Sequence, residues 1–425
     1  MSHSPESLDS PGSVNAPLRL AVALDGAGRH PAAWRVPGAR PAELFTPRYW
    51  VDLAVEAERG LLDFVTFEDS LAWQSAEADG LDGDPGRVRG RLDALLTAAR
   101  VAPATRHLGL VPVVTATHTE PFHVSKAVAT LDHVSAGRAG LWVRWTGRAD
   151  EVAHVGRRSP GEAPGRLTTE AADHVEVVRR LWDSWEDDAE IRDVATGRFV
   201  DRERLHYVDF AGQWFAVRGP SITPRPPQGQ PVVAVGVTAA EHSHTLAARA
   251  ADLAFVSPVD TSSTRAAVHR LRAARSEVGR RAEPLGIFGE LTVFLADSAG
   301  AARDRLARLD ELAGSAFTTG DAGPGVLPRE AAGVVEDTDG FGGGRAAVFT
   351  GTPTELADLL VSWRRAGLGG FRLRPGVLAE DLPAITRGLV PELRARGVFR
   401  SAYEADSLRG LLGLERPANR YATAR

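Results

Sequence analysis

Short apolar segments rich in β-branched residues alternate with longer segments of helical periodicity along most of this 425-residue chain. Such alternation indicates parallel strands that are joined by helical crossovers. Eight repeats over about 400 residues predict a (β/α)8 TIM barrel, and a doubly wound open sheet is the alternative. No Gly-x-Gly-x-x-Gly turn follows an early strand, which counts against a dinucleotide-binding half. The predicted strands are Leu18–Leu24, Leu62–Phe67, Leu108–Val114, Gly140–Trp145, Pro231–Val235, Leu253–Ser257, Gly286–Leu295 and Gly370–Leu373.

Helical patterns follow most of these strands. Thr352 and Pro353 supply an N-cap and a first-turn proline for one of them. The predicted helices are Tyr49–Arg59, Val124–His133, Thr169–Trp185, Ala239–Ala250, Arg265–Gly279, Ala302–Ala313 and Thr354–Ala366.

Two segments are too long for a minimal barrel and predict insertions after the fourth and seventh strands. In the first, about residues 187–230, apolar alternation around Tyr207 and Trp214 predicts a β-hairpin. The second, about residues 314–345, is rich in glycine and predicts a flexible loop. Residues 1–16, rich in Ser and Pro, predict a disordered tail before a single barrel domain over residues 17–425.

Composition limits the chemistry. The chain has no cysteine, which excludes disulfides, iron–sulfur clusters and cysteine nucleophiles. Lys126 is the only lysine, so a lysine Schiff base would have to use it. A net charge of -5 gives no electrostatic case for nucleic acid or membrane. No signal peptide or apolar run of about 20 residues is present, so the protein is expected in the cytoplasm.

The strand ends hold the residues from which a site would be built, because reactive groups in such barrels cluster at the carboxyl ends of the strands. Aromatic side chains at these ends, including Trp34, Phe67 and Trp145, could wall a dry apolar cavity. Polar side chains at or near the same ends are His30, Thr115, Thr146 and Thr238.

Two other kinds of site have weaker support. His242 and His244 lie two positions apart on a predicted helix start, so they point about 200° apart and ligate one metal poorly. A two-carboxylate glycosidase site needs a fixed separation between its acids, which the sequence does not give. The acids near strand ends are Glu68, Asp69, Glu120 and Glu241.

Four blocks of sequence go beyond what barrel packing requires. They are Leu131–Gly140 (LDHVSAGRAG), Val175–Trp185 (VEVVRRLWDSW), Arg218–Gly229 (RGPSITPRPPQG) and the C-terminal run Gly397–Asn419, which Arg400, Tyr403, Arg409 and Arg416 punctuate. Together they resemble the luciferase-like flavin-dependent monooxygenase family, in the branch of the nitrilotriacetate and dibenzothiophene-sulfone monooxygenases. The resemblance covers roughly Leu18 to Asn419.

The resemblance implies a barrel of the bacterial-luciferase type that binds FMN noncovalently at the strand carboxyl ends. It implies a two-component monooxygenase, in which a separate NAD(P)H:flavin reductase supplies reduced FMN. Dioxygen would form a flavin hydroperoxide that oxidises a small, partly apolar organic substrate, while the protein keeps the pocket dry. Since the family is commonly dimeric, a homodimer or higher homo-oligomer is expected.

Carried over by position, the resemblance also implies site residues. Thr115 matches a hydroxyl that contacts the flavin ring, and His30 matches a catalytic histidine that serves peroxide or substrate. Trp34, Phe67 and Trp145 would line the substrate side. The implied cofactor-binding positions are Thr115, Trp142, Thr146, Thr168, Thr238 and Ala239.

The sequence departs from the family pattern at three places in this site. A ring-contacting Asn is replaced by Trp142, a phosphate-binding Tyr by Thr168, and the phosphate motif AGSS reads Val237-Thr238-Ala239-Ala240. Arg144 and Arg166 are the candidates to neutralise the phosphate instead. Each lost hydrogen bond to a charged group costs about 1.5–3 kcal/mol. The departures keep two alternatives open: a deazaflavin-dependent oxidoreductase of the same fold, and a noncatalytic binding protein with a degraded flavin site.

Overall fold

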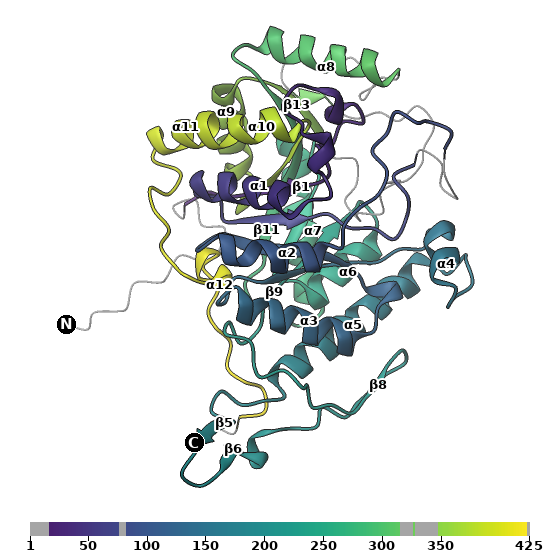
Figure 1. Cartoon of the computed structure of the whole chain (residues 1–425), viewed down its shortest axis with the longest axis vertical. Helices are drawn as coiled ribbons and strands as arrows, with labels where there is room; N and C mark the ends of the chain where they lie inside the picture. The colour runs from purple at the N-terminus through teal and green to yellow at the C-terminus, as the bar shows by residue number, and fades with distance from the viewer. Residues whose placement is uncertain (1–16, 76–81, 315–325, 328–346, 423–425) are drawn as a thin grey trace, which may run out of the picture.

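A closed barrel of eight parallel strands forms the centre of the molecule (Figure 1). The computed structural model describes residues 17–75, 82–314, 326–327 and 347–422. Each barrel strand pairs in parallel with the next along the chain, and the last pairs with the first. The predicted (β/α)8 barrel is therefore confirmed. The barrel strands are β1 (Arg19–Leu24), β2 (Phe64–Phe67), β3 (Gly109–Thr115), β4 (Gly140–Arg144), β9 (Val232–Val237), β10 (Leu253–Val256), β11 (Gly286–Leu295) and β14 (Gly370–Pro375).

Helices cover the outside of the barrel. Proline begins several of them, where its missing N–H costs nothing, and Asp260 and Thr352 form capping boxes before the helices that begin at Thr261 and Pro353. A π-helical turn, η6 (Ile385–Leu389), joins two helices near the C-terminus. The helices are α1 (Pro47–Arg59), α2 (Ala94–Val101), α3 (Pro121–Val134), α4 (Ala149–Val155), α5 (Pro164–Asp183), α6 (Glu241–Ala250), α7 (Thr261–Glu277), α8 (Ala299–Ala313), α9 (Pro353–Arg365), α10 (Leu378–Ala384), α11 (Val390–Ala395) and α12 (Leu408–Leu411).

The seventh barrel strand has an extra neighbour that the sequence did not predict. β11 is ten residues long. Its first half pairs with β10, and its second half pairs with β13 (Ala347–Gly351). A short strand β12 (Val326–Leu327) pairs antiparallel with β13. The rest of the loop predicted for residues 314–345, after Gly314, lies outside the described residues, as does the predicted tail 1–16.

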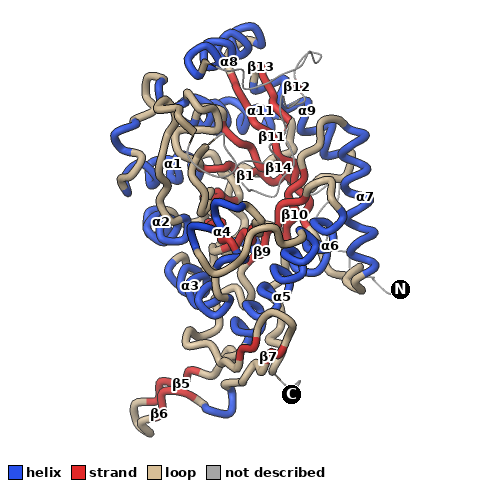
Figure 2. The backbone as a smooth tube through the Cα atoms, turned by 90° about the vertical axis from the view of Figure 1, so that its right-hand side faces the viewer, coloured by secondary structure: helices blue, strands red, loops and turns tan. Residues whose placement is uncertain are grey.

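The insertion between β4 and β9 contains two hairpins at the end of the molecule away from α8 (Figure 2). β7 (Phe210–Ala211) pairs with β8 (Ala216–Val217) within the segment whose alternation predicts a hairpin. β5 (Glu190–Asp193) and β6 (Arg198–Val200) form a second hairpin that the sequence did not indicate. The second hairpin is mostly exposed and highly charged, so it carries no apolar alternation to find.

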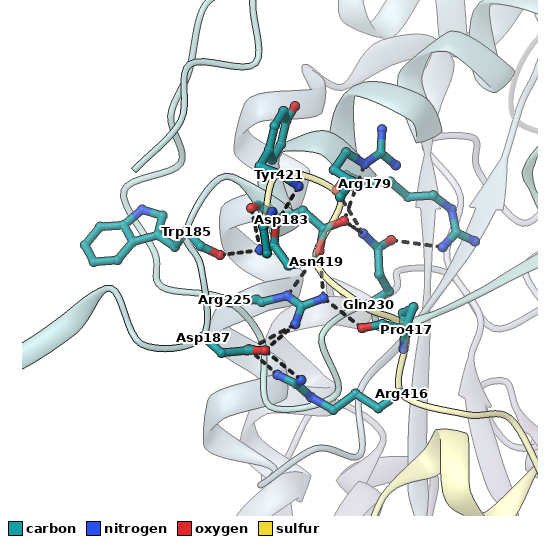
Figure 3. Close-up of polar contacts among 12 residues, drawn as sticks. Arg179, Asp183, Trp185, Asp187, Arg225, Gln230, Arg416, Pro417, Asn419 and Tyr421 are labelled. Atoms are coloured by element: carbon teal, nitrogen blue, oxygen red, sulfur yellow. Dashed lines mark hydrogen bonds and ion pairs between the residues drawn. The ribbon is translucent and has the colours of Figure 1, made fainter. Parts of the chain in front are cut away.

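The C-terminal segment closes the amino end of the barrel. Leu408, Leu412 and Leu414 pack inside it with Phe64 and Phe255. Beyond α12 the chain runs to the insertion, where Asn419 donates to the carbonyl oxygens of Asp183 (2.8 Å) and Trp185 (2.7 Å), as Figure 3 shows. In this C-terminal run, Leu408, Leu412 and Leu414 therefore form a plug in the amino end of the barrel, and Asn419 fastens the chain to the start of the insertion. None of the helices in the described ranges combines the length and apolar character needed to cross a membrane.

Candidate active site

The carboxyl ends of the barrel strands and the segments that follow them form the barrel mouth. A buried polar chain crosses it from β3 to β2. Arg144, at the end of β4, donates to Thr115 Oγ1 (3.0 Å) and binds Glu151 of α4 through two contacts (2.6 and 3.2 Å). Ser70 donates to the same Glu151 carboxylate (2.8 Å). Because Thr115 accepts from Arg144, its own hydroxyl hydrogen is left to donate to a ligand.

This geometry removes one of the two arginines expected to neutralise the flavin phosphate. Arg144 was a candidate to neutralise a flavin phosphate, but its guanidinium is buried and bound to Glu151 on two nitrogens. Arg166 behaves differently. It is exposed in the first turn of α5 and lies 4.4 Å from the ring centre of Trp214 in the hairpin insertion. Stacking on an aromatic face leaves the edge N–H groups of a guanidinium available to an anion.

Trp142 lies inside the barrel below the mouth. Its side chain is 1% exposed, its ring centre lies 4.7 Å from that of Phe255, and the guanidinium of Arg372 lies 4.3 Å from its ring centre. The position that the resemblance gives to a small ring-contacting amide is therefore filled by a large side chain of the barrel interior. Trp142 can reach a cofactor only as the floor beneath it.

A charged network lies beside Trp142 in the barrel interior. Arg372 is fully buried and binds the carboxylates of Glu68 and Glu290, and its Nε donates to Thr66 Oγ1 (2.9 Å). Thr66 in turn donates to Glu68 Oε1 (2.7 Å). The second oxygen of Glu68 has no hydrogen-bond partner in the described part of the chain. The sequence indicated none of this network, since Arg372 and Glu68 are 304 positions apart.

His30 is engaged on both ring nitrogens. Its Nδ1 accepts from the Ala32 amide (3.1 Å), and its Nε2 contacts Asp310 of α8 (3.0 Å). Burial lowers the pKa of His30, and the bond to Asp310 opposes this only in part. A neutral ring with the hydrogen on Nε2 satisfies both contacts. His30 thus ties the loop after β1 to α8.

The other predicted residues of the first and fourth loops are anchored as well. Trp34 donates its indole N–H to the carbonyl of Gly86 (2.7 Å). Thr146 is buried, and its amide donates to Thr117 Oγ1 (3.0 Å). Trp145 is half-buried and meets His242 of α6 edge to face at 5.4 Å. Trp145 is thus the predicted aromatic that stands between the fourth and fifth strand ends.

The turn between β9 and α6, which the resemblance assigns to phosphate, is partly closed on itself. The Thr238 amide donates to Ser243 Oγ (3.1 Å), and the Ala240 amide donates to Thr238 Oγ1 (3.2 Å). Ala239 is exposed, and an acid, Glu241, begins the helix. Thr168 is buried in α5 and donates to the Gly165 carbonyl (3.1 Å). The predicted phosphate residues lie near the starts of two helices, α5 and α6, and Arg166 lies in the first turn of α5.

A small hollow with a cavity volume of about 20 Å³, room for about one water molecule, lies beside the ends of β1 and β2. Phe67 lines it, as does Glu68, and α1 and α2 supply Trp50 and Thr97. Phe67 is buried between the barrel and the helix layer, with its ring centre 6.5 Å from that of Trp50. His30, Thr115 and Trp145 do not line this hollow.

Unpaired polar atoms around the mouth test whether a flavin fits. Glu68 Oε2, both ring nitrogens of His118 and Ser257 Oγ are buried and lack partners among the described residues. These residues follow β2, β3 and β10. A flavin ring edge offers both donors and acceptors, so it can satisfy such atoms, and buried polar atoms are rarely left unpaired. The residues present fit the ring end of a flavin, and the exposed guanidinium of Arg166 in the first turn of α5 offers a cationic group for its phosphate.

His118 and Ser257 are polar residues of the mouth that the sequence did not single out as ligand contacts. His118 lies in η4 (Ala116–His118), directly after Thr115, and burial lowers its pKa. Its position at the end of β3 was visible in the sequence. The signal that was missing is the lack of a partner, which only the packing reveals.

Comparison with known proteins gives a consistent result. Residues 28–369 match the family model described as luciferase-like monooxygenase. The chain is 32% identical to N-acetyl-S-(2-succino)cysteine monooxygenase of Bacillus subtilis (strain 168), covering 95% of this chain and 98% of that protein. It is 31% identical to nitrilotriacetate monooxygenase component A of Aminobacter aminovorans, covering 96% and 99%. A crystal structure of riboflavin lyase with modified FMN and riboflavin superimposes with a TM-score of 0.80 at 28% identity, covering 95% and 97%. The chain belongs to the luciferase-like monooxygenase family, in the branch that includes nitrilotriacetate monooxygenase.

Proposed function

We propose that this protein is the oxygenase component of a two-component monooxygenase, which uses reduced FMN and dioxygen to oxidise a small, partly apolar organic molecule. The observation that carries the proposal is the set of unpaired buried polar atoms around the mouth of a luciferase-like barrel. These atoms are costly without a ligand, and a flavin ring supplies the missing partners.

The residues take the following roles. Thr115, fixed by Arg144, donates its hydroxyl hydrogen to the flavin ring. Trp142 forms the floor below the ring, and Trp145 walls its side. Thr146 holds the turn that places Trp145, through its amide bond to Thr117.

The starts of α5 and α6 would hold the phosphate. Arg166 supplies the positive charge, and Thr168 anchors the first turn from which it projects. Thr238 and Ala239 contribute backbone and hydroxyl groups from the second helix start. First-turn amides have no partner within their own helix, which favours an anion there.

Bound reduced FMN supplies two electrons to dioxygen, so that one oxygen atom enters the substrate and the other leaves as water. The chain's own residues exclude water and orient the substrate. Phe67 and Trp34 lie on the substrate side. His30 positions the loop that carries Trp34, because both of its ring nitrogens are already engaged.

A separate NAD(P)H:flavin reductase supplies the reduced FMN. One relative is named as component A of its monooxygenase, which supports a partner of this kind. We propose a homodimer or a higher homo-oligomer as the working assembly, as the family resemblance implies.

The proposal is tested by oxygen consumption with a flavin reductase, NADH, FMN and a panel of small organic compounds. At least one compound should yield a product that carries an atom from ¹⁸O₂. If every compound returns all the consumed oxygen as hydrogen peroxide, the proposed function is wrong. Thr115→Val should weaken FMN binding up to about tenfold by removing one hydrogen bond. Thr130→Val, an exposed threonine of α3, is the matched control.

A further inference from the structure

The hairpin of β7 and β8 lies along α5, with its turn near the amino end of that helix. Its inner side packs against α5, where the ring centre of Phe215 lies 5.8 Å from that of His174. Trp214, in the turn of the hairpin, reaches further toward the helix start and stacks on Arg166 in the first turn. The insertion therefore brings one side chain to the helix start that is proposed to hold the flavin phosphate.

Trp214 has one polar side-chain atom, and that atom is unsatisfied. The side chain is half-buried, and its Nε1 is buried without a hydrogen-bond partner among the described residues. An indole N–H can only donate, so the missing partner is an acceptor. Buried polar atoms are rarely left unpaired, which makes this nitrogen a contact for a ligand.

The charges at this helix start favour an anion as the acceptor. Arg158 binds the acids four positions before and after Arg166, which are Glu162 (3.2 Å) and Glu170 (2.7 Å). Arg166 itself pairs with no acid in the part of the chain that the structure describes, so its charge is unbalanced. The helix has no acid in its first turn and no side-chain cap, which leaves the positive end of its dipole unopposed. A guanidinium, an indole N–H and a helix start supply donors only, and an anion suits all three.

We propose that Trp214 binds the phosphate of FMN together with Arg166, so that the hairpin insertion supplies part of the cofactor site. The indole N–H donates to one phosphate oxygen, and the guanidinium of Arg166 donates to another while it stacks on the indole ring. This role rests on the proposed function for the identity of the ligand, whereas an anion site at this pair does not depend on catalysis. Trp214 thereby compensates for Thr168, which stands where the resemblance expects a phosphate-binding tyrosine.

The test compares ligands that differ in the phosphate. The full-length protein is titrated anaerobically in a calorimeter with reduced FMN, reduced riboflavin and inorganic phosphate. Trp214→Phe keeps an aromatic face for Arg166 but lacks the N–H. It should weaken FMN binding about tenfold or more, the size expected for one hydrogen bond to a charged group. Riboflavin binding should stay unchanged, which also shows that the variant is folded.

Two further variants complete the comparison. Arg166→Gln should weaken FMN binding by a similar factor and should also leave riboflavin binding unchanged. Tyr207→Phe is the matched control, because Tyr207 lies in the same insertion and its ring stacks on Arg218 at the same distance of 4.4 Å. Its side chain is 55% exposed, so its hydroxyl meets solvent and its loss should not change FMN binding.

Two results overturn the proposal: FMN binding to Trp214→Phe that is as tight as to the wild type, or equal losses of FMN and riboflavin binding in that variant. If the wild type binds FMN and riboflavin equally well, the flavin function stands and the phosphate site is refuted. If neither flavin binds, but inorganic phosphate binds and does so more weakly to Trp214→Phe, the pair serves another phosphate compound and the proposed function is wrong.

Discussion

Replacing Arg225 with methionine is predicted to lower the free energy of unfolding by about 3–5 kcal/mol, the cost of removing one partner from a buried ion pair. The side chain of Arg225 extends from the insertion to Pro417 in the C-terminal segment (Figure 3). Its side chain is 2% exposed, and that of its partner Asp183 is 3% exposed. It donates twice to Asp183 (3.0 and 3.1 Å), twice to Asp187 (2.8 and 2.9 Å) and once to the carbonyl of Pro417 (2.9 Å).

The predicted loss of unfolding free energy is set by the burial of the Arg225–Asp183 pair and not by the number of hydrogen bonds. Methionine keeps most of the apolar stem, so the loss comes from leaving Asp183 Oδ1 without a donor in a dry site, while Oδ2 keeps its contacts with Gln230 (2.7 Å) and Arg420 (3.4 Å). Arg416 is the matched control, because it also pairs with Asp187 but is 45% exposed. An exposed pair contributes about 0–1 kcal/mol, so Arg416→Met should cost under about 1 kcal/mol.

The assay is equilibrium unfolding in urea, followed by circular dichroism and tryptophan fluorescence, with coincident transitions required for a two-state analysis. The double variant Arg225→Met with Asp183→Asn should regain part of the loss, because it removes the carboxylate charge that Arg225 no longer balances. Equal losses of unfolding free energy for Arg225→Met and Arg416→Met would show that burial does not set the cost of removing these arginines.

Three further predictions concern other parts of the chain. Leu408→Ala should cost about 2–5 kcal/mol in the same urea assay, because this fully buried side chain packs against Gly109 and Gly140, whereas the exposed Leu96→Ala should cost almost nothing. Burial raises the pKa of Asp381 to about 6, so the stability that its protonation contributes is present below its ordinary value of 3.8 and is lost as pH rises through 6. The melting temperature of Asp381→Asn should therefore rise relative to that of the wild type between pH 4 and pH 7. A difference that does not change with pH would contradict this pKa. His30→Asn keeps an acceptor for the Ala32 amide but loses Asp310, so it should lower the free energy of unfolding by about 0.5–1.5 kcal/mol; a large loss of kcat at unchanged stability would instead show that His30 acts on the reactants.

The barrel could be predicted because its strands are continuous apolar runs bounded by glycine and proline, a pattern that local sequence records. β13 was missed because Ala347–Gly351 is short and follows a glycine-rich stretch that reads as loop. The plug was missed for a different reason. Leu408, Leu412 and Leu414 make too short a pattern to predict a buried element, and their burial depends on the open amino end of a barrel formed elsewhere in the chain.

Strand-end residues could be located from sequence, but their partners could not. Thr115 was placed correctly at the end of β3, yet the Arg144 and Glu151 pair that fixes its hydroxyl became visible only in the structure. The inward direction of Trp142 follows from alternation along β4, where Val143 faces outward into the helix layer. That alternation could have shown that a tryptophan fills the barrel there. The unpaired oxygen of Glu68 could not have been inferred, because it depends on how Arg372, 304 positions away, packs against Glu68 in the folded barrel.

The account rests most directly on binding of reduced FMN at the barrel mouth, and one titration tests it. Purified protein is titrated anaerobically with photoreduced FMN while quenching of tryptophan fluorescence is followed, since Trp142 and Trp145 lie below and beside the proposed ring position. Saturable binding in the micromolar range is expected, weakened in Arg166→Gln. Absence of binding up to millimolar flavin would contradict the proposed function and leave a deazaflavin enzyme or a noncatalytic barrel as the explanation.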